Sequence, residues 1–286
     1  MQRQPLAASQ RERIAAGLPF VESLARRGAA SMPQSIELGD LVQDGMLFLP
    51  QPGPTRPPQA RGGRAIEPLA FTVGDGVTVR GWLVRSTQTA SPLVIYYGGN
   101  AEEVSWQAGE PWPADWSLAL VNYRGYGQSE GKPSEQALFA DAELVFDALV
   151  ARADVDRARI VLVGRSLGSG VATYLASRRE VAGLVLISPY DSMTALGQRH
   201  YPFLPVRLLL KHPFDSLARA PAISAPLLAI VGERDGIIPP EHSRRLFDAW
   251  GGPKRWTSIP DAGHNDLGAQ REFWNPIAEF LAERAR

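Results

Sequence analysis

Short apolar runs separated by turns dominate the chain from about Leu69 onward. Leu69–Val73 and Thr78–Arg85 alternate apolar and polar residues on either side of the turn at 74–76, which predicts a β-hairpin. Six further apolar runs predict strands at Pro92–Tyr97, Ser117–Tyr123, Arg159–Gly164, Gly183–Ser188, Pro226–Gly232 and Arg255–Ile259. Most of them are continuously apolar, as expected for strands covered on both faces.

Between these runs, apolar residues recur at the spacing of helices. The four predicted helices are Gln136–Arg152, Leu167–Arg178, Pro240–Trp250 and Pro276–Arg284. Asn275 and Pro276 fit an N-cap followed by proline at the first helical position. Eight strands alternating with helices predict an α/β fold, with a mostly parallel sheet and helices on both faces.

The first part of the chain has a different pattern. Within residues 10–46, apolar side chains recur at helical spacing, at Ile14, Leu18, Val21, Leu24 and Ala25. Residues 50–63 (PQPGPTRPPQARGG) are crowded with proline and glycine and predict an irregular loop. We therefore expect a helical extension over residues 1–45 and one main domain over residues 46–286.

Composition narrows the possible functions. The 286 residues include 30 Lys and Arg against 30 Asp and Glu, and this neutral balance argues against general nucleic-acid binding. Because cysteine is absent, disulfides, thiolate metal sites and cysteine nucleophiles are excluded. Every apolar run is far shorter than the roughly 20 residues that span a bilayer, so we expect a cytoplasmic protein without an integral membrane segment.

A candidate nucleophile lies where the strand ending at Gly164 meets the following helix. GRSLG at 164–168 has the pattern G-x-S-x-G at a strand-to-helix turn, which is tight and needs small residues at both ends. Gly164 and Gly168 leave room for crossing backbones, and Ser166 is thereby held at the carboxyl edge of the sheet, where open α/β sheets bind ligands. We predict Ser166 as a catalytic nucleophile.

The candidate base is one of only four histidines. His264 follows the last predicted strand, where a serine hydrolase needs its base. His200 and His212 lie away from any predicted strand end and are expected at the surface or as caps. His242 begins a predicted helix, so capping or exposure is expected for it.

The acid that orients the base should follow the penultimate strand, where Asp235 lies in GERDGIIP at 232–239. A carboxylate there can fix the tautomer of His264 and stabilise its imidazolium form. The order Ser166, Asp235, His264 is that of α/β-hydrolases. Glu233 and Asp191 are rival acids, although a helix N-cap is the simpler role for Asp191.

Acyl-transfer intermediates need two N–H donors for the developing oxyanion. The backbone of Leu167, directly after the nucleophile, is expected to supply one of them. The loop after Pro92–Tyr97 should supply the other, through the backbone of Asn100. Gly98 and Gly99 let this loop approach the substrate closely.

Taken together, seven ordered motifs resemble the α/β-hydrolase superfamily, in particular small-cap serine hydrolases related to serine aminopeptidases and prolyl-oligopeptidase-like enzymes. They are MLFLPQP at 46–52, YYGGNAEE at 96–103, NYRGYGQSEG at 122–131, GRSLGSG at 164–170, SPYDS at 188–192, GERDGIIP at 232–239 and PDAGHND at 260–266. The resemblance implies an eight-stranded α/β-hydrolase fold that hydrolyses esters, thioesters or amides. Gly98 departs from the pattern, because many relatives have histidine there.

A short cap is expected around residues 191–225, between the strands ending at Ser188 and beginning at Pro226. Tyr201 and Phe203 in this cap, together with Trp106, Gly98 and Gly99, are predicted to bind substrate. The aromatic and aliphatic side chains of this region either line an acyl pocket or serve as core, and the sequence does not choose between them.

Residues 10–46 resemble the start of the second conserved region of flagellar-type sigma factors. The match ends at Met46, before the segments that act on promoter DNA in that family.

The sequence therefore predicts a serine hydrolase that acts on a small-molecule acyl substrate or a short peptide, with neither metal nor cofactor. A catalytically silent α/β-hydrolase scaffold that binds a ligand is the alternative. A transcription-linked protein acting through residues 10–46 is a further alternative, although neutral charge and the truncated match argue against it.

Overall fold

The computed structural model describes residues 47–285 apart from residues 89 and 204. The chain divides after Leu49 into two units, and the fold below is that of the second unit, Pro50–Arg286. The helix expected within residues 10–46, and the resemblance noted for that segment, lie outside the described residues.

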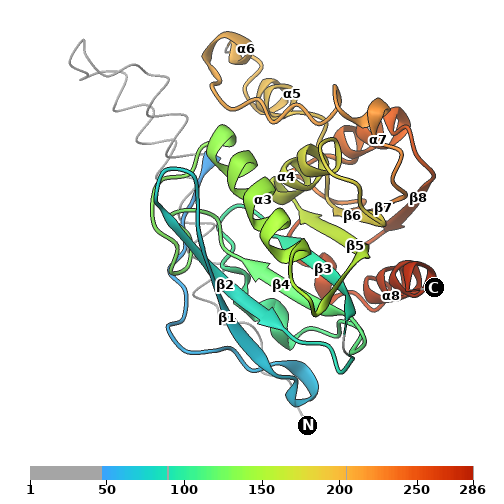
Figure 1. The fold of residues 1–286 in the computed structure, drawn as a ribbon. Helices are drawn as coiled ribbons and strands as arrows, with labels where there is room; N and C mark the ends of the chain where they lie inside the picture. Colours follow the sequence, from blue (N-terminus) through green and yellow to red (C-terminus); the bar gives the residue numbers. More distant parts are fainter. Residues whose placement is uncertain (1–46, 89, 204, 286) are drawn as a thin grey trace, which may run out of the picture. The chain divides into compact units, whose positions relative to one another are not determined.

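Eight strands form one sheet in the order β1-β2-β4-β3-β5-β6-β7-β8 (Figure 1). The strands are β1 (Ile66–Thr72), β2 (Thr78–Val84), β3 (Ser91–Tyr97), β4 (Ser117–Val121), β5 (Val155–Arg165), β6 (Gly183–Ile187), β7 (Leu227–Gly232) and β8 (Lys254–Ile259). β2 pairs antiparallel with β1 and β4, and every pair from β4 to β8 is parallel. The predicted hairpin and the mostly parallel sheet are thus confirmed.

The predicted starts of two strands are wrong: β1 begins at Ile66 rather than Leu69, and the larger difference is at β5. β5 begins at Val155 rather than Arg159, because a polar stretch at 156–159 precedes its apolar centre and hides the strand in the sequence. Val155 pairs with Ser91, and the register with β3 then shifts before Ile160 pairs with Leu93. Such a bulge lets an exposed polar segment join the edge of a buried strand.

The helices are α3 (Glu135–Val150), α4 (Leu167–Ala176), α5 (Met193–His200), α6 (Val206–Leu209), α7 (Pro240–Ala249) and α8 (Trp274–Arg284). The four predicted helices correspond to α3, α4, α7 and α8, whereas α5 and α6 were not predicted as helices. Short 3-10 turns occur at η1 (Arg61–Gly63), η2 (Val104–Gly109), η3 (Ala220–Ala222) and η4 (Leu267–Ala269).

The start of α8 differs from the predicted capping pattern. Phe273 holds the N-cap position, so Asn275 lies inside the helix and Pro276 is its third residue. Proline fits there without loss, because the first helical N–H groups have no partner within the helix. The predicted N-cap role of Asn275 is therefore wrong.

The sheet carries helices on both faces. α3 and α4 lie in front of the sheet in Figure 1. On the other face, side chains from η2 and α8 join one buried cluster with alternate residues of the strands, among them Val94 and Tyr96 of β3. Trp112 and Trp116 belong to this cluster, so these two aromatics serve as core. Burial on both faces explains why the central strands are continuously apolar.

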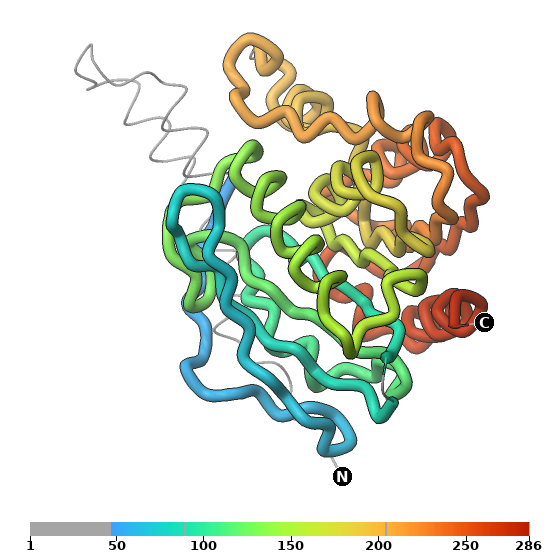
Figure 2. Tube along the Cα trace, viewed as in Figure 1, coloured from blue at the N-terminus to red at the C-terminus, as the bar shows by residue number. Residues whose placement is uncertain are grey.

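The segment between β6 and β7 forms the cap. It contains α5, α6 and η3, and α5 and α6 project at one edge of the fold beyond α3 and α4 (Figures 1 and 2). Among residues 47–285, no helix has both the length and the apolar character that a membrane span requires.

Candidate active site

Ser166 lies at the turn between β5 and α4 in a strained backbone conformation. Its φ of 51° and ψ of −116° are unusual for a residue with a Cβ and cost of order 1–3 kcal/mol. Hydrogen bonds hold it there, since its N–H donates to Ile187 O at 2.9 Å and its carbonyl accepts from the Ser169 backbone N–H and hydroxyl. Its own side chain does not cap α4, which leaves Oγ directed to another partner.

Two glycines make this turn sterically possible. A Cβ on Gly168 would lie 2.1 Å from Tyr97 O, and a Cβ on Gly164 would lie 2.5 Å from Gly168 O. No side chain fits at such distances, so the turn passes directly against the end of β3. The small residues expected in GRSLG are therefore a steric requirement of the turn between β5 and α4.

The structure brings Ser166, His264 and Asp235 together from three loops. The Oγ atom of Ser166 lies 3.0 Å from Nε2 of His264, and Nδ1 of His264 lies 2.7 Å from Oδ2 of Asp235. Because a carboxylate only accepts hydrogen bonds, Nδ1 carries the proton and Nε2 is left to accept from the serine hydroxyl.

Asp235 is buried and held on both oxygens. Its Oδ1 accepts from the backbone N–H groups of Ile237 and Ile238 at 3.0 and 2.8 Å, so only Oδ2 faces His264. Burial raises the pKa of Asp235, but the hydrogen bond and charge of His264 and the Ile238 N–H together lower it below its ordinary value. The carboxyl group is therefore an anion at neutral pH.

The loop after β3 lies beside the serine. The position of a Cβ on Gly99 would be 3.5 Å from Cβ of Ser166, so Gly99 passes close to the candidate nucleophile. Tyr123 donates to Gly98 O at 2.8 Å, and Tyr126 donates to the side-chain oxygen of Asn100 at 2.9 Å. The motif at 122–131 thus fixes the shape of this loop. Leu167 begins α4, where N–H groups lack partners within the helix.

A buried ion pair beside this loop escaped the sequence analysis. Glu102 accepts from Gly99 N–H at 2.6 Å, from the Tyr96 hydroxyl at 2.9 Å and from Arg165 at 3.0 Å. Arg165 also donates to His264 O at 3.4 Å. Burial lowers the pKa of Arg165, but the charges of Glu102 and other groups around it, together with the hydrogen bond to Glu102, raise it above its ordinary value, so the guanidinium stays charged. The pair thus links the loop after β3 and the turn of Ser166 to the loop of His264.

The rival acids lie elsewhere. Glu233 is exposed. Asp191 is buried, with Oδ1 2.8 Å from Nδ1 of His242 and Oδ2 2.7 Å from Nε of Arg245. The N-cap role expected for Asp191 is wrong, because Ser192 caps α5. The expectation for His242 is also wrong, because His242 is neither exposed nor a cap. His242 is buried because the first turn of α7 packs its polar face against the loop after β6.

The other histidines lie as expected. His200 is exposed and its Nε2 lies 2.9 Å from Ile237 O. Nδ1 of His212 accepts from the N–H of Glu135 at 3.4 Å, at the start of α3.

The predicted substrate-binding aromatics are exposed. Trp106 is 49% exposed, and Tyr201 and Phe203 project from the cap. Their role in binding substrate stays a prediction.

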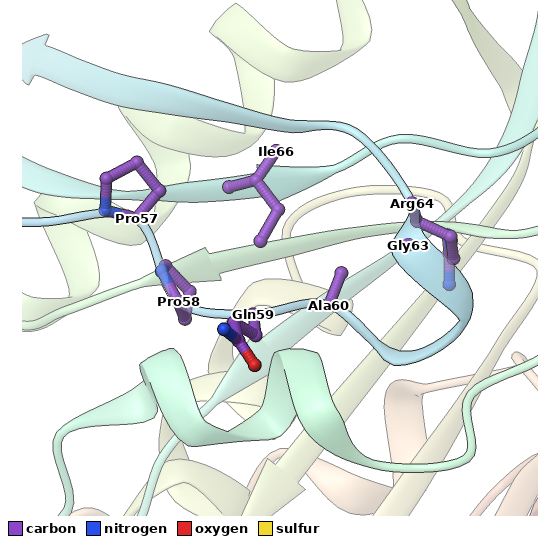
Figure 3. Close-up of a pocket in the computed structure, with 7 residues that line it drawn as sticks. All are labelled: Pro57, Pro58, Gln59, Ala60, Gly63, Arg64 and Ile66. Atoms are coloured by element: carbon purple, nitrogen blue, oxygen red, sulfur yellow. The ribbon is translucent and has the colours of Figure 1, made fainter.

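A separate cavity of about 530 Å³ lies against the start of β1 (Figure 3). It is lined by Pro57, Pro58, Gln59, Ala60, Gly63, Arg64 and Ile66. Arg64 is its only charged group, and its guanidinium donates to the carbonyls of Arg85, Val84 and Trp116. The cavity therefore offers no acid–base pair comparable to that beside Ser166.

Comparison with known proteins agrees with this fold. The family profile described as alpha/beta hydrolase fold matches residues 91–211. Over 246 residues the chain is 39% identical to the uncharacterized protein Rv2307c of Mycobacterium tuberculosis, covering 84% of this chain and 87% of the relative. The chain has the α/β-hydrolase fold. Ser166, His264 and Asp235 accordingly stand at the carboxyl ends of an α/β-hydrolase sheet.

Solved structures share this α/β-hydrolase fold. Acetyl xylan esterase 1 from a Thermoanaerobacterium species superposes with a TM-score of 0.64 at 18% identity, covering 78% of this chain and 89% of the esterase. The esterase Pf2001 of Pyrococcus furiosus gives 0.60 at 21% identity, covering 81% and 100%. At these identities, the likeness shows the fold alone.

Proposed function

We propose that this α/β-hydrolase is a serine hydrolase that cleaves an acyl ester, thioester or amide through an acyl-enzyme. The observation that carries the proposal is the continuous hydrogen-bond chain from Ser166 Oγ through His264 to Asp235, at 3.0 and 2.7 Å. A serine is activated when its hydroxyl donates to an imidazole nitrogen that acts as a base, and when a carboxylate orients that imidazole.

In the first step, Ser166 Oγ attacks the substrate carbonyl carbon while its proton passes to Nε2 of His264. The imidazolium that forms keeps its Nδ1–H on Asp235, whose negative charge stabilises it. Because the pKa of Asp235 is lowered, the carboxyl group stays charged through the step. The former carbonyl oxygen then carries the negative charge.

That oxyanion is held by the backbone N–H groups of Leu167 and Asn100 in the proposed mechanism. Support for Leu167 comes from its place at the N-terminus of α4, where N–H groups and the helix dipole favour negative charge. Support for Asn100 comes from the loop of Gly99, which passes next to Ser166. Removal of one such donor lowers kcat by about 10²–10³-fold in serine hydrolases.

The intermediate collapses when His264 protonates the leaving group, and the acyl group remains on Ser166 as an ester. Water then attacks this ester while His264 accepts a proton, and the acid is released as His264 returns the proton to Ser166. The three side chains supply every proton transfer. We place the protein among the small-cap serine hydrolases, acting on a small acyl compound or a short peptide. The two structural neighbours named as esterases support the acyl ester among these substrates.

A fluorophosphonate probe tests the nucleophile directly. We expect the wild type to be labelled, Ser166→Ala to lose labelling, and kcat on an activated ester to fall at least about 10⁴-fold. Ser177→Ala is the matched control, because Ser177 lies at the far end of α4 and its hydroxyl donates to the backbone carbonyl of Tyr174. A panel of esters, thioesters and aminoacyl amides then identifies the substrate class. Labelling that persists in Ser166→Ala would contradict the proposal.

A further inference from the structure

The cap carries a local positive charge in a protein whose net charge is zero. No Asp or Glu occurs between Asp191 and Asp215, whereas Arg199 and Arg207 lie within this segment. Both side chains are exposed. Arg199 is 3.8 Å from Glu241, but both partners are more than half exposed, and such a pair screens little of its charge.

The same segment exposes large apolar side chains. Phe203 is 96% exposed and Leu208 is 84% exposed, and Tyr201 and Leu209 are exposed beside them. Outside the cap, the exposed large apolar side chains of the described second unit, such as Trp106, do not form such a run. A concentration of this kind marks an interaction surface more often than an ordinary exterior.

The packing of α6 explains why these side chains face outward. Val206 is buried and packs against α5, where a Cβ on Gly197 would lie 3.0 Å from its Cγ1. With Val206 turned inward, Arg207 and Leu208 project to the exterior, and the two short helices stand at the edge of the fold (Figure 2). The outer side of the cap is thus apolar and basic.

We propose that the outer side of the cap, formed by Arg199, Tyr201, Phe203, Arg207 and Leu208, docks onto an anionic membrane surface. Exposed aromatic and aliphatic side chains beside arginines, on a segment that itself carries no carboxylate between Asp191 and Asp215, are a composition that binds the boundary of anionic bilayers. A second copy of the chain fits less well, because a symmetric contact would bring the arginines of two caps together.

Docking would place the candidate active site beside the bilayer. Nε2 of His200, at the end of α5, lies 2.9 Å from Ile237 O, and the N–H of Ile237 donates to Asp235. The cap is therefore in direct contact with the loop of the orienting acid. An acyl substrate carried by the membrane would then reach Ser166 from the docked side. This consequence rests on the proposed function, whereas docking itself does not.

Sedimentation with vesicles tests the docking separately from catalysis. We use full-length Ser166→Ala with vesicles of phosphatidylcholine alone and of phosphatidylcholine with phosphatidylglycerol. We expect binding to the anionic vesicles only, weakened by salt. Adding Phe203→Ser and Leu208→Ser should weaken it at least about tenfold, because two apolar side chains no longer enter the bilayer. Arg207→Glu should weaken it about tenfold at low salt.

Matched controls separate the cap from general effects. Trp106→Ser removes an exposed aromatic outside the cap, and Arg157→Glu makes the same charge change near the amino end of β5, away from Ser166. Both should bind vesicles as Ser166→Ala does. The proposal is overturned if anionic vesicles are not bound, if the cap variants bind unchanged, or if Phe203→Ser instead dissociates a dimer in analytical ultracentrifugation.

Discussion

Two buried aspartate–histidine pairs lie at the same edge of the sheet. Asp235 and His264 are 2.7 Å apart, and Asp191 and His242 are 2.8 Å apart. Each histidine approaches its carboxylate through Nδ1, so the two pairs look alike at the level of a single hydrogen bond. Only one of them faces a serine.

The difference lies in the third partner. Oδ2 of Asp191 is bound by Arg245, a permanent cation, and Nη2 of Arg245 also lies 2.8 Å from Nδ1 of His242. Oδ2 of Asp235 accepts the Nδ1 proton of His264 instead. A carboxylate that already neutralises an arginine stabilises a transient imidazolium less, and the arginine repels it. His264 is also 9% exposed against 2% for His242, so the pair beside Ser166 keeps an opening for substrate.

Replacing each histidine with alanine should give the largest difference between the two aspartate–histidine pairs. His264→Ala removes the proposed base, and we expect kcat on an activated ester to fall at least about 10³-fold. His242→Ala should leave kcat within a few fold. It should lower the free energy of unfolding by about 2 kcal/mol, because Asp191 loses a buried partner.

Steady-state kinetics and urea unfolding on the same preparations measure both effects. If His242→Ala remained folded and yet lost as much activity as His264→Ala, the distinction between the two pairs would be wrong.

The two arginines offer a second contrast. Arg165→Met leaves the buried carboxylate of Glu102 without its cation, near Gly99 and Ser166, where negative charge opposes the oxyanion. We expect kcat to fall about 10–100-fold, less than the roughly 10²–10³-fold lost with one oxyanion donor, with little change in KM. Arg245→Met should change kcat little and lower the free energy of unfolding by about 1–3 kcal/mol.

A double variant shows whether Arg165 acts through charge. Adding Glu102→Gln to Arg165→Met removes the uncompensated carboxylate and should recover part of kcat, and Arg165→Lys should retain most of it. If the double variant were less stable than the wild type and its kcat stayed as low as that of Arg165→Met, Arg165 would serve only to stabilise the fold.

The smallest expected effect is the pH dependence of stability. Because the folded state lowers the pKa of Asp235, the ionised carboxylate stabilises the fold above its ordinary pKa of 3.8. That contribution is lost as pH falls through the lower folded-state pKa. The difference in free energy of unfolding between wild type and Asp235→Asn should therefore be constant near neutral pH and shrink below about pH 4. If the difference in free energy of unfolding stayed the same below about pH 4, the lowered pKa of Asp235 in the folded state would be contradicted.

Much of the fold follows from local patterns. The turn glycines and the alternation from 69 to 85 specify the hairpin, and continuously apolar runs specify strands covered on both faces. The site residues are also predictable, because parallel strands bring their carboxyl ends to one edge. Ser166, Asp235 and His264 each follow such an end, and the structure brings them within hydrogen-bond distance. Strand ends with polar residues, as at the start of β5, were predicted poorly. Exposed strand residues can be polar on both faces, so the apolar pattern that identifies a strand is missing there.

Sequence by itself therefore determined the strand and helix order and the three loops on which the candidate chemistry lies, since these depend on periodicity and on turns that require glycine. Only the tertiary structure decided which charges meet. Glu102 and Arg165 are 63 positions apart, and Asp191 and His242 are 51 apart. No local pattern marks such partners, because they are selected by burial: a charged group removed from water needs a partner, and only the packed sheet and its loops determine which one lies in reach.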